Sequence, residues 1–131
     1  MRYLLDSNAV IMLLNGSCPA LAQRVRQNRP GDIGISSIVS HELFYGAFKS
    51  RRAEHNVALV DSLQFEVVEF DKEDSRQAGE IRAALAARGA PIGPYDVLIA
   101  GQAMARGLIL ITHNTAEFGR VAGLQFEDWE V

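Results

Sequence analysis

Short apolar runs alternate with segments of helical periodicity along this chain. The apolar runs are brief and sharply ended, which is typical of strands. These predicted strands cover residues 2–6, 33–35, 65–70, 108–112 and 124–126. The run at 108–112, Leu-Ile-Leu-Ile-Thr, is the clearest of them, and such fully apolar strands fit a sheet that is covered on both faces.

Apolar residues at helical spacing predict helices between these strands. Ser, Asp or Pro stands near their starts and Gly near several of their ends, as helix termini prefer. The predicted helices cover 7–14, 19–27, a segment beginning at Ser36 or Ser37, 51–63, 72–88 and 94–107. Residues 28–31 are predicted as a loop, and a turn-rich stretch follows residue 112. The alternation predicts an α/β fold with a mainly parallel sheet.

The length of 131 residues predicts one domain, with enough chain to bury a core. No apolar run reaches the roughly 18 residues that a membrane helix needs. Asp6, Ser7 and Asn8 interrupt the N-terminal apolar run too early for a signal peptide. A single cysteine, Cys18, excludes an internal disulfide and a cysteine metal cluster. Together these features predict a cytoplasmic protein.

The net charge of −3 argues against a protein that binds nucleic acid by neutralising phosphates alone. Such a partner would require local basic patches or bound metal ions. Basic side chains gather in two places, Arg24 to Arg29 and Lys49 to Arg52. Either group is explained by solvated helix ends and turns, or by contact with nucleic acid.

Several acids are predicted to meet where strands end. Asp6 ends the first strand, while Thr112, His113 and Asn114 end the strand 108–112, with Glu117 close behind. Ligands of open α/β sheets bind at the carboxyl ends of the strands. Both groups would therefore face one crevice if the two strands are neighbours. The alternative for Asp6 is a helix N-cap.

Two further acids lie on predicted helices. Asp96 stands in the first turn of the helix that Pro94 opens, where the helix dipole should keep its carboxylate ionised at neutral pH. Helix capping explains Asp96 equally well. Glu42 lies among apolar residues, so it is either at the solvated edge of its helix or paired.

Three carboxylates in one crevice would repel by roughly 4 kcal/mol per pair at about 4 Å and an effective dielectric near 20. Protons or cations must offset such a cluster. Oxygen ligands favour Mg²⁺ or Mn²⁺ over Zn²⁺. The histidines, His41, His55 and His113, are not spaced as a zinc site, and His41 is either an outer neighbour of the cluster or an ordinary surface or core residue.

Four segments in order resemble the PIN-domain toxins of the VapC family: YLLDSN, SxxxxHELFYGA, IGPYDVLIAGQAMARGLILIT and HNTAEFGRVAGLQFEDW. The resemblance covers essentially the whole chain. It implies a PIN-like fold, a short parallel sheet sandwiched by helices. It also implies an endoribonuclease toxin, dependent on Mg²⁺ or Mn²⁺, that cuts structured RNA such as tRNA and so stops translation. A VapB antitoxin is the implied inhibitor, a homodimer the implied assembly, and operator DNA would be contacted only through the antitoxin.

The family's acids fall on Asp6, Glu42 and Asp96. Its fourth acidic position falls on Asn114, so a second metal would depend on the amide oxygen of Asn114 or on Glu117. Ser7 stands where many relatives have Thr, and its hydroxyl can still support a carboxylate. Thr112 is the other supporting residue that we expect. Candidates for RNA contact are Lys49, Arg51, Arg52 and Arg82.

The expected chemistry is attack of an activated water on the phosphodiester, leaving 5′-phosphate and 3′-hydroxyl ends. A phosphotransferase of the haloacid-dehalogenase type would need a second acid where Asn8 stands. A response-regulator receiver would need adjacent acids after the first strand and a lysine after a late one, and both are missing. A PIN fold that only binds a partner stays open, with Asn114 in its favour. Phe44, Tyr45 and Phe48 would suit a partner surface.

Overall fold

A five-stranded parallel sheet forms the centre of the protein, whose computed structural model describes residues 1–131. The strands lie in the order β3-β2-β1-β4-β5, and every neighbouring pair is parallel. Their bounds are Tyr3–Leu5 for β1, Ile33–Ser36 for β2, Glu66–Val68 for β3, Ile109–Ile111 for β4 and Phe126–Glu127 for β5. The predicted α/β fold is confirmed, with a sheet that is parallel throughout.

Helices fill every connection between the strands. Their bounds are Ser7–Asn15 for α1, Pro19–Arg26 for α2, Ser37–Lys49 for α3, Ala53–Asp61 for α4, Lys72–Ala87 for α5, Pro94–Arg106 for α6 and Thr115–Phe118 for α7. A 3-10 turn at Pro30–Asp32 precedes β2. Crossing a bilayer would need a longer and more apolar helix than any of these.

The predicted boundaries differ from the structure mainly at strand ends. The segment 65–70 shortens to β3, an edge strand with Glu66 and Val67 exposed. The helix predicted at 51–63 shortens to α4. The turn-rich stretch after residue 112 contains α7, whose four residues are too few to show helical periodicity. The last strand shifts from 124–126 to β5, because the Leu124 N–H donates to the Val121 carbonyl within a turn.

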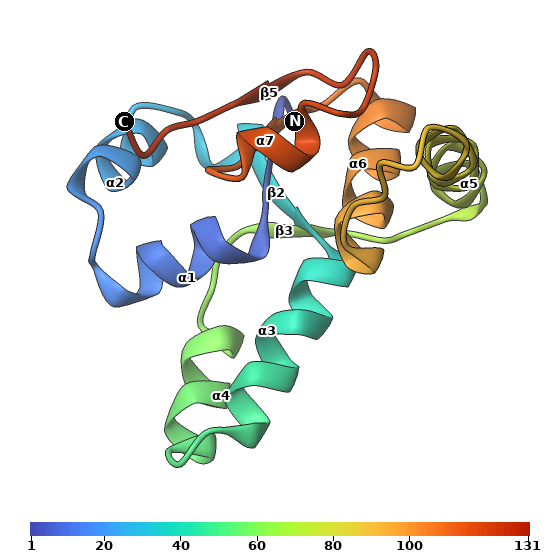
Figure 1. Cartoon of the computed structure of the whole chain (residues 1–131). Coiled ribbons are helices and arrows are strands. Elements are labelled where there is room, and N and C mark those ends of the chain that lie inside the picture. Colours follow the sequence, from blue (N-terminus) through green and yellow to red (C-terminus); the bar gives the residue numbers. More distant parts are fainter.

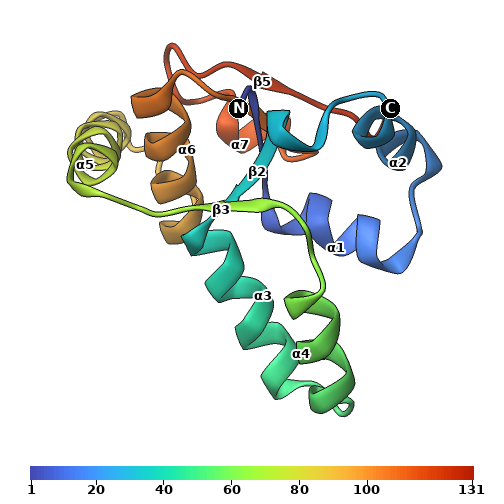
Figure 2. The ribbon, with the colours of Figure 1, turned by 180° about the vertical axis from the view of Figure 1, so that it is seen from behind.

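Helices cover the two faces of the sheet. Figure 1 shows α1 and α2 on one side and α5 and α6 on the other. The chain moves from β1 out to β3 in one direction and through β4 to β5 in the other. With the right-handed connections that parallel strands prefer, this reversal places helices on both faces. Between these layers Leu4, Leu5 and Leu110 are fully buried. Seen from behind in Figure 2, α3 and α4 form a hairpin that projects beyond the sheet.

The strand order brings two strand ends together at the point where the chain changes direction. In the register of the sheet, Leu5 pairs with Ile35 on one side and with Ile111 on the other. The residues that follow, Asp6 and Thr112, therefore emerge side by side at the carboxyl edge. In open α/β sheets this is the place where ligands bind.

Candidate active site

Asp6 lies at the centre of the carboxyl edge and is only 6% exposed. Its carboxylate accepts a hydrogen bond of 2.8 Å from the Ala9 backbone N–H, which caps α1, and the Thr112 hydroxyl also donates to it. Burial raises the pKa of Asp6, and the charges of Glu130 and Glu42 raise it further, while the two hydrogen bonds act in the opposite direction. The helix-cap interpretation of Asp6 is therefore confirmed, and the same carboxylate lies at the carboxyl edge of the sheet.

Glu42 reaches the same edge from the second turn of α3 and is half-buried. The Ser7 hydroxyl donates to Glu42 Oε1 at 2.8 Å. Because Ser7 is the first residue of α1, this bond joins two helices that leave adjacent strands. Glu42 is thus paired, and the hydroxyl that we expect to support a carboxylate supports this one.

Asp96 enters from the first turn of α6 and is half-buried. Burial raises the pKa of Asp96 to about 6, and the charges of Glu117, Glu42 and Asp6 add to the effect, as does a hydrogen bond with Glu117. At neutral pH the group is still mostly ionised, as the sequence predicts. The shift nevertheless runs opposite to the one that the α6 dipole alone would cause, because burial and like charges outweigh it.

Glu117 adds a fourth carboxylate from α7. Asn114 stands at the N-cap of this helix, and its side-chain amide donates to Glu117 Oε2 at 2.7 Å. The backbone N–H of Asn114 donates to the Thr112 hydroxyl at 3.0 Å. The hydrogen bond from Asn114 therefore holds the Glu117 carboxylate in place, and the charge of Glu117 raises the pKa of Asp96.

The four carboxylates have no protein cation among them. The five ion pairs of the protein all lie elsewhere. Like charges repel, and no three of the four acids offer ligand atoms within 4.8 Å of one another. These oxygen donors, buried in Asp6 and half-buried in the other three acids, carry uncompensated negative charge, which fits a hard divalent cation such as Mg²⁺ or Mn²⁺.

A second cluster, which the sequence pattern does not predict, borders the first. His113 Nδ1 lies 2.8 Å from Asp128 Oδ2, and Glu130 offers a carboxylate oxygen within 4.8 Å of both. The hydrogen bond with Asp128 raises the pKa of His113, and the charges of Asp128 and Glu130 add to it. Only the position of β5 beside β4 brings residues 113 and 128 together, so the spacing of residues along the chain does not predict this cluster.

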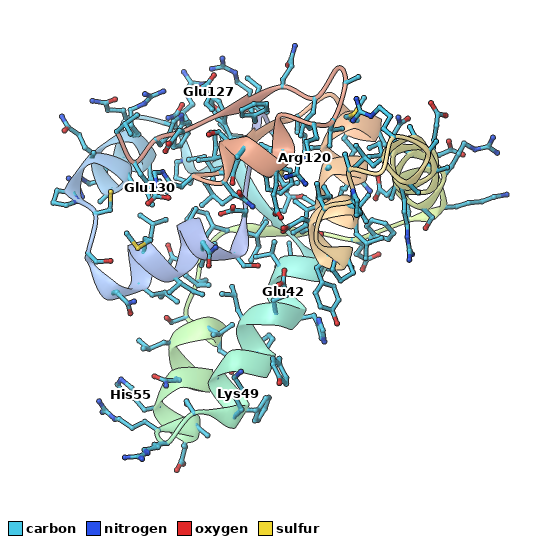
Figure 3. The ribbon with its side chains drawn as sticks, in the orientation of Figure 1. Glu42, Lys49, His55, Arg120, Glu127 and Glu130 are labelled. Carbon is cyan, nitrogen blue, oxygen red and sulfur yellow. The ribbon has the colours of Figure 1, made fainter.

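The basic residues predicted to contact RNA do not lie among the acids. Figure 3 shows Glu42 at the sheet end of α3 and Lys49 at the other end. Seven residues of helix separate these two by about 10 Å along the axis. Arg51 and Arg52 stand in the turn between α3 and α4. Arg82 is exposed on α5, beside a pocket of 330 Å³ that Pro94 and Val97 help to line.

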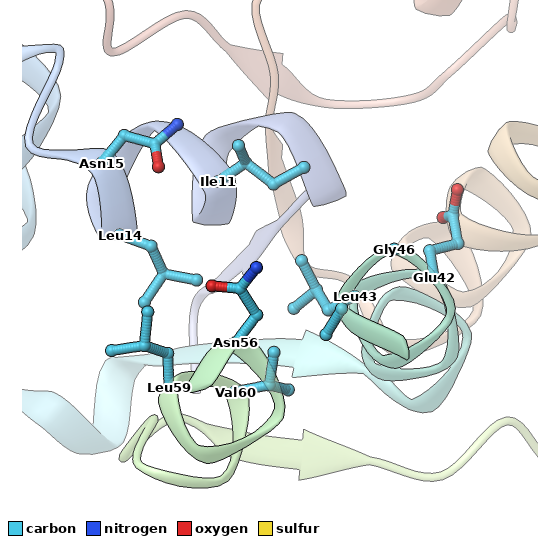
Figure 4. Close-up of a pocket in the computed structure, with 10 residues that line it drawn as sticks. Ile11, Leu14, Asn15, Glu42, Leu43, Gly46, Asn56, Leu59 and Val60 are labelled. Carbon is cyan, nitrogen blue, oxygen red and sulfur yellow. The ribbon is translucent and has the colours of Figure 1, made fainter. Parts of the chain in front are cut away.

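An apolar groove of 280 Å³ opens between α1, α3 and α4. Figure 4 shows Ile11 and Leu14 facing Leu59 and Val60 across it, with Glu42 at one end. Ile11 and Leu59 are 42% and 37% exposed, which is high for aliphatic side chains. The groove therefore runs from apolar residues directly to one of the acids.

The comparisons with known proteins agree with this geometry. The model of the PIN domain matches residues 3–124. Over 131 residues the chain is 40% identical to a protein of Shigella flexneri named tRNA(fMet)-specific endonuclease VapC, with 98% of both chains covered. Among solved structures it is similar to DNA-bound VapBC from Salmonella typhimurium, with a TM-score of 0.94, 40% identity and 98% of each chain covered. It is also similar to VapBC-1 from nontypeable Haemophilus influenzae, with a TM-score of 0.89, 34% identity and the same coverage.

Proposed function

This chain belongs to the PIN-domain family and is a ribonuclease of the VapC group, and on that premise we propose that it is a toxin that cuts tRNA with the help of Mg²⁺ or Mn²⁺. The observation that carries the proposal is the meeting of four carboxylates, from Asp6, Glu42, Asp96 and Glu117, at the strand-order switch of the sheet. The tRNA substrate is inferred from the relatives in Shigella and Salmonella, whose names specify it.

Each residue has a distinct task in this proposal. Asp6 and Asp96, with Glu42, are the proposed ligands of a divalent cation, which would supply an activated water and offset charge on the phosphate. Ser7 holds Glu42, and Thr112 holds Asp6, so that neither carboxylate turns freely. Asn114 and Glu117 are proposed to hold a second cation more weakly, since only Glu117 carries a charge.

Attack by water does not require the 2′-hydroxyl of RNA. We therefore expect products with 5′-phosphate and 3′-hydroxyl ends. A PIN fold that binds a partner without cutting RNA is the alternative that Asn114 favours. A metal-dependent phosphotransferase is the other alternative. Incubating the purified protein with phosphate monoesters and with tRNA shows whether it acts as a phosphotransferase or as a ribonuclease.

The variant Asp6→Asn tests the active site. Asn keeps an oxygen that can accept from the Ala9 N–H, so the cap of α1 survives while the charge is lost. We expect cleavage of tRNA to fall at least about 100-fold, with Tm changed by no more than about 4 °C. The control is Asp61→Asn at the exposed end of α4, which should cleave as the wild type does. Full activity of Asp6→Asn would reject the assignment of this carboxylate.

The groove between α1, α3 and α4 is the proposed site of the antitoxin. Solved relatives are complexes of toxin with antitoxin, and some include DNA. An apolar segment would cover Ile11 and Leu59, and an Arg side chain could then reach the acids beyond Glu42. Operator DNA would be bound by the antitoxin, not by this acidic chain.

Leu59→Asp tests this surface. A charge in the apolar groove should weaken binding of a cognate VapB-type antitoxin by at least about 10-fold, while leaving tRNA cleavage intact. Ala58→Asp, exposed on the same helix, is the matched control. In cells, we expect the antitoxin to relieve growth arrest by the control but not by Leu59→Asp. Equal relief for both variants would place the antitoxin on another surface.

A homodimer and a cytoplasmic location complete the proposal. Tyr45 and Phe48 are 61% and 67% exposed on α3, and a second copy is the occupant we propose for them. Light scattering of Phe48→Glu against wild type tests it, and a monomer in both would contradict it. The cytoplasm is where a tRNA substrate is found.

A further inference from the structure

Two exposed aromatic rings lie close together, each on the residue before an acid of the site. His41 on α3 and Tyr95 on α6 have their ring centroids 5.7 Å apart, with the planes tilted by 58°. Each ring belongs to the residue directly before a site acid, Glu42 or Asp96. Consecutive Cα atoms are about 3.8 Å apart, so each ring starts from a backbone position next to that of a site acid.

Packing in the hydrophobic core does not account for this pair. Tyr95 is 45% exposed and His41 is also exposed, and neither belongs to the hydrophobic core or packs against it. Buried residues such as Val97 and Leu43 hold α6 and α3 in the core. The two rings instead contact each other between α3 and α6 and stay exposed to solvent.

The charge around the site limits how RNA can be held there. Asp6, Glu42, Asp96 and Glu117 repel phosphates, and the basic residues of the α3–α4 turn lie at the other end of α3. Stacking on an aromatic face is much less sensitive to this field, and every base has such a face. Tyr and His are among the side chains on which unpaired RNA bases stack.

We propose that His41 and Tyr95 form a platform on which an unpaired base beside the scissile phosphate stacks. The proposal rests on the ribonuclease function proposed above. It implies that the protein cuts RNA in loops or other single-stranded parts, because a base within a duplex cannot reach the platform. The platform positions the phosphate over the carboxylates and is itself no part of the chemistry.

An abasic scan of the substrate tests the platform. Once the cut is mapped on a tRNA-derived stem–loop, single bases on each side of it are removed in turn. For the wild type, one abasic position should lower kcat/KM by about 10-fold to 100-fold, the range for loss of one stacked base. On the intact substrate, Tyr95→Ala should show the same loss of kcat/KM. Removing that base from the substrate should lower the kcat/KM of Tyr95→Ala no further. Tyr95→Phe should cleave as the wild type does.

His55→Ala is the control, because His55 is an exposed ring on α4, away from the acid cluster, and contacts neither Tyr95 nor His41. It should keep both the activity and the response to the abasic position. Binding of the same labelled RNA without divalent ions gives a second readout, which stands even if the protein cuts no RNA. Tyr95→Ala should there bind intact and abasic RNA equally.

Two results would overturn the proposal. In one, Tyr95→Ala remains as sensitive to every abasic position as the wild type. In the other, it loses affinity only in proportion to a fall in Tm, which indicates a packing role. If the wild type cleaves no RNA but its binding still depends on the stacked base, the ribonuclease function is rejected and the platform proposal is supported.

Discussion

Single carboxylates at this site serve the fold and the proposed chemistry at once. Asp6 caps α1 through one bond to Ala9 and also accepts from Thr112, yet a carboxylate has about four sites for acceptance. Lone pairs therefore remain for another ligand. The same placement has an energetic consequence, because a buried acid among other acids is easier to protonate than one in water.

Asp96→Asn should stabilise the protein in the absence of divalent ions at neutral pH. The pKa of Asp96 is raised to about 6 from 3.8, so the folded state binds more protons than the unfolded state between these values. Stability therefore falls as pH rises through this window, and the loss is complete above it. For a half-buried group we expect about 1 kcal/mol, or about 4 °C in Tm, after allowance for solvent screening.

Thermal melts in EDTA at pH 3.5 and pH 7.5 measure this effect. The gain of Asp96→Asn should be present at pH 7.5 and absent at pH 3.5. Glu80→Gln, exposed on α5, should show no gain at either pH. An equal gain at both values would mean that charge is not its cause.

Asn114→Asp should lower the Mg²⁺ concentration that half-maximal cleavage requires. The added carboxylate would stand beside Glu117, where Asn114 now donates at 2.7 Å, and a hard cation prefers a charged oxygen. Glu117→Gln should raise that concentration by about as much. Three superimposable titrations would show that neither residue touches a metal, leaving Asp6, Glu42 and Asp96 as the whole site.

At the level of elements, the closely packed pair α5 and α6 positions Asp96. Gly101 makes the close approach possible, because a Cβ placed there would lie 2.6 Å from the backbone of Ala78. Farther along α6, Arg106 donates to the buried carboxylate of Asp74 at 3.1 Å. The start of α6, and with it the Asp96 carboxylate, is thus held by contacts more than one turn away.

Gly101→Ala should separate α5 from α6 and destabilise the fold by about 1–3 kcal/mol, as overpacking does. Gly79 on α5 provides the control, since a Cβ there would meet nothing within 4 Å. Gly79→Ala should stabilise by about 0.5–1 kcal/mol through helix propensity. Urea unfolding of both variants gives the comparison, and two changes of the same sign would contradict the packing argument.

For the whole molecule, opposite charges occupy different places. Acids gather at the carboxyl edge of the sheet, while Lys49, Arg51 and Arg52 lie at the far end of the α3–α4 hairpin. An RNA bound over both would have its backbone held at one end and be cut at the other. The net charge of −3 is therefore compatible with an RNA substrate.

The double variant Arg51→Glu, Arg52→Glu should weaken tRNA binding about 10-fold or more at low salt and reduce its salt dependence. Its kcat at saturating tRNA should change little, because the acids are untouched. Arg76→Glu on α5, where an exposed ion pair with Glu73 forms, is the control. Unchanged binding by the double variant would exclude the hairpin end as an RNA surface.

Local patterns in the sequence determined the strands and all the helices except α7, and they marked the main acids. The apolar runs predict every strand to within a few residues, and the place of Asp6 and Thr112 at strand ends follows from them. The position of Asp96 in a first turn follows from Pro94. These features depend on neighbours along the chain, through backbone geometry and helix capping, so they can be predicted without knowing the fold.

Tertiary structure decided which of these residues meet. Only the order of the strands places β1 beside β4, and only this order brings Ser7 to Glu42, His113 to Asp128 and His41 to Tyr95. The raised pKa values of Asp6 and Asp96 likewise depend on burial and on charges from distant segments. Local periodicity carries no record of such partners, because desolvation and Coulomb energy depend on distances in space and not on separation along the chain.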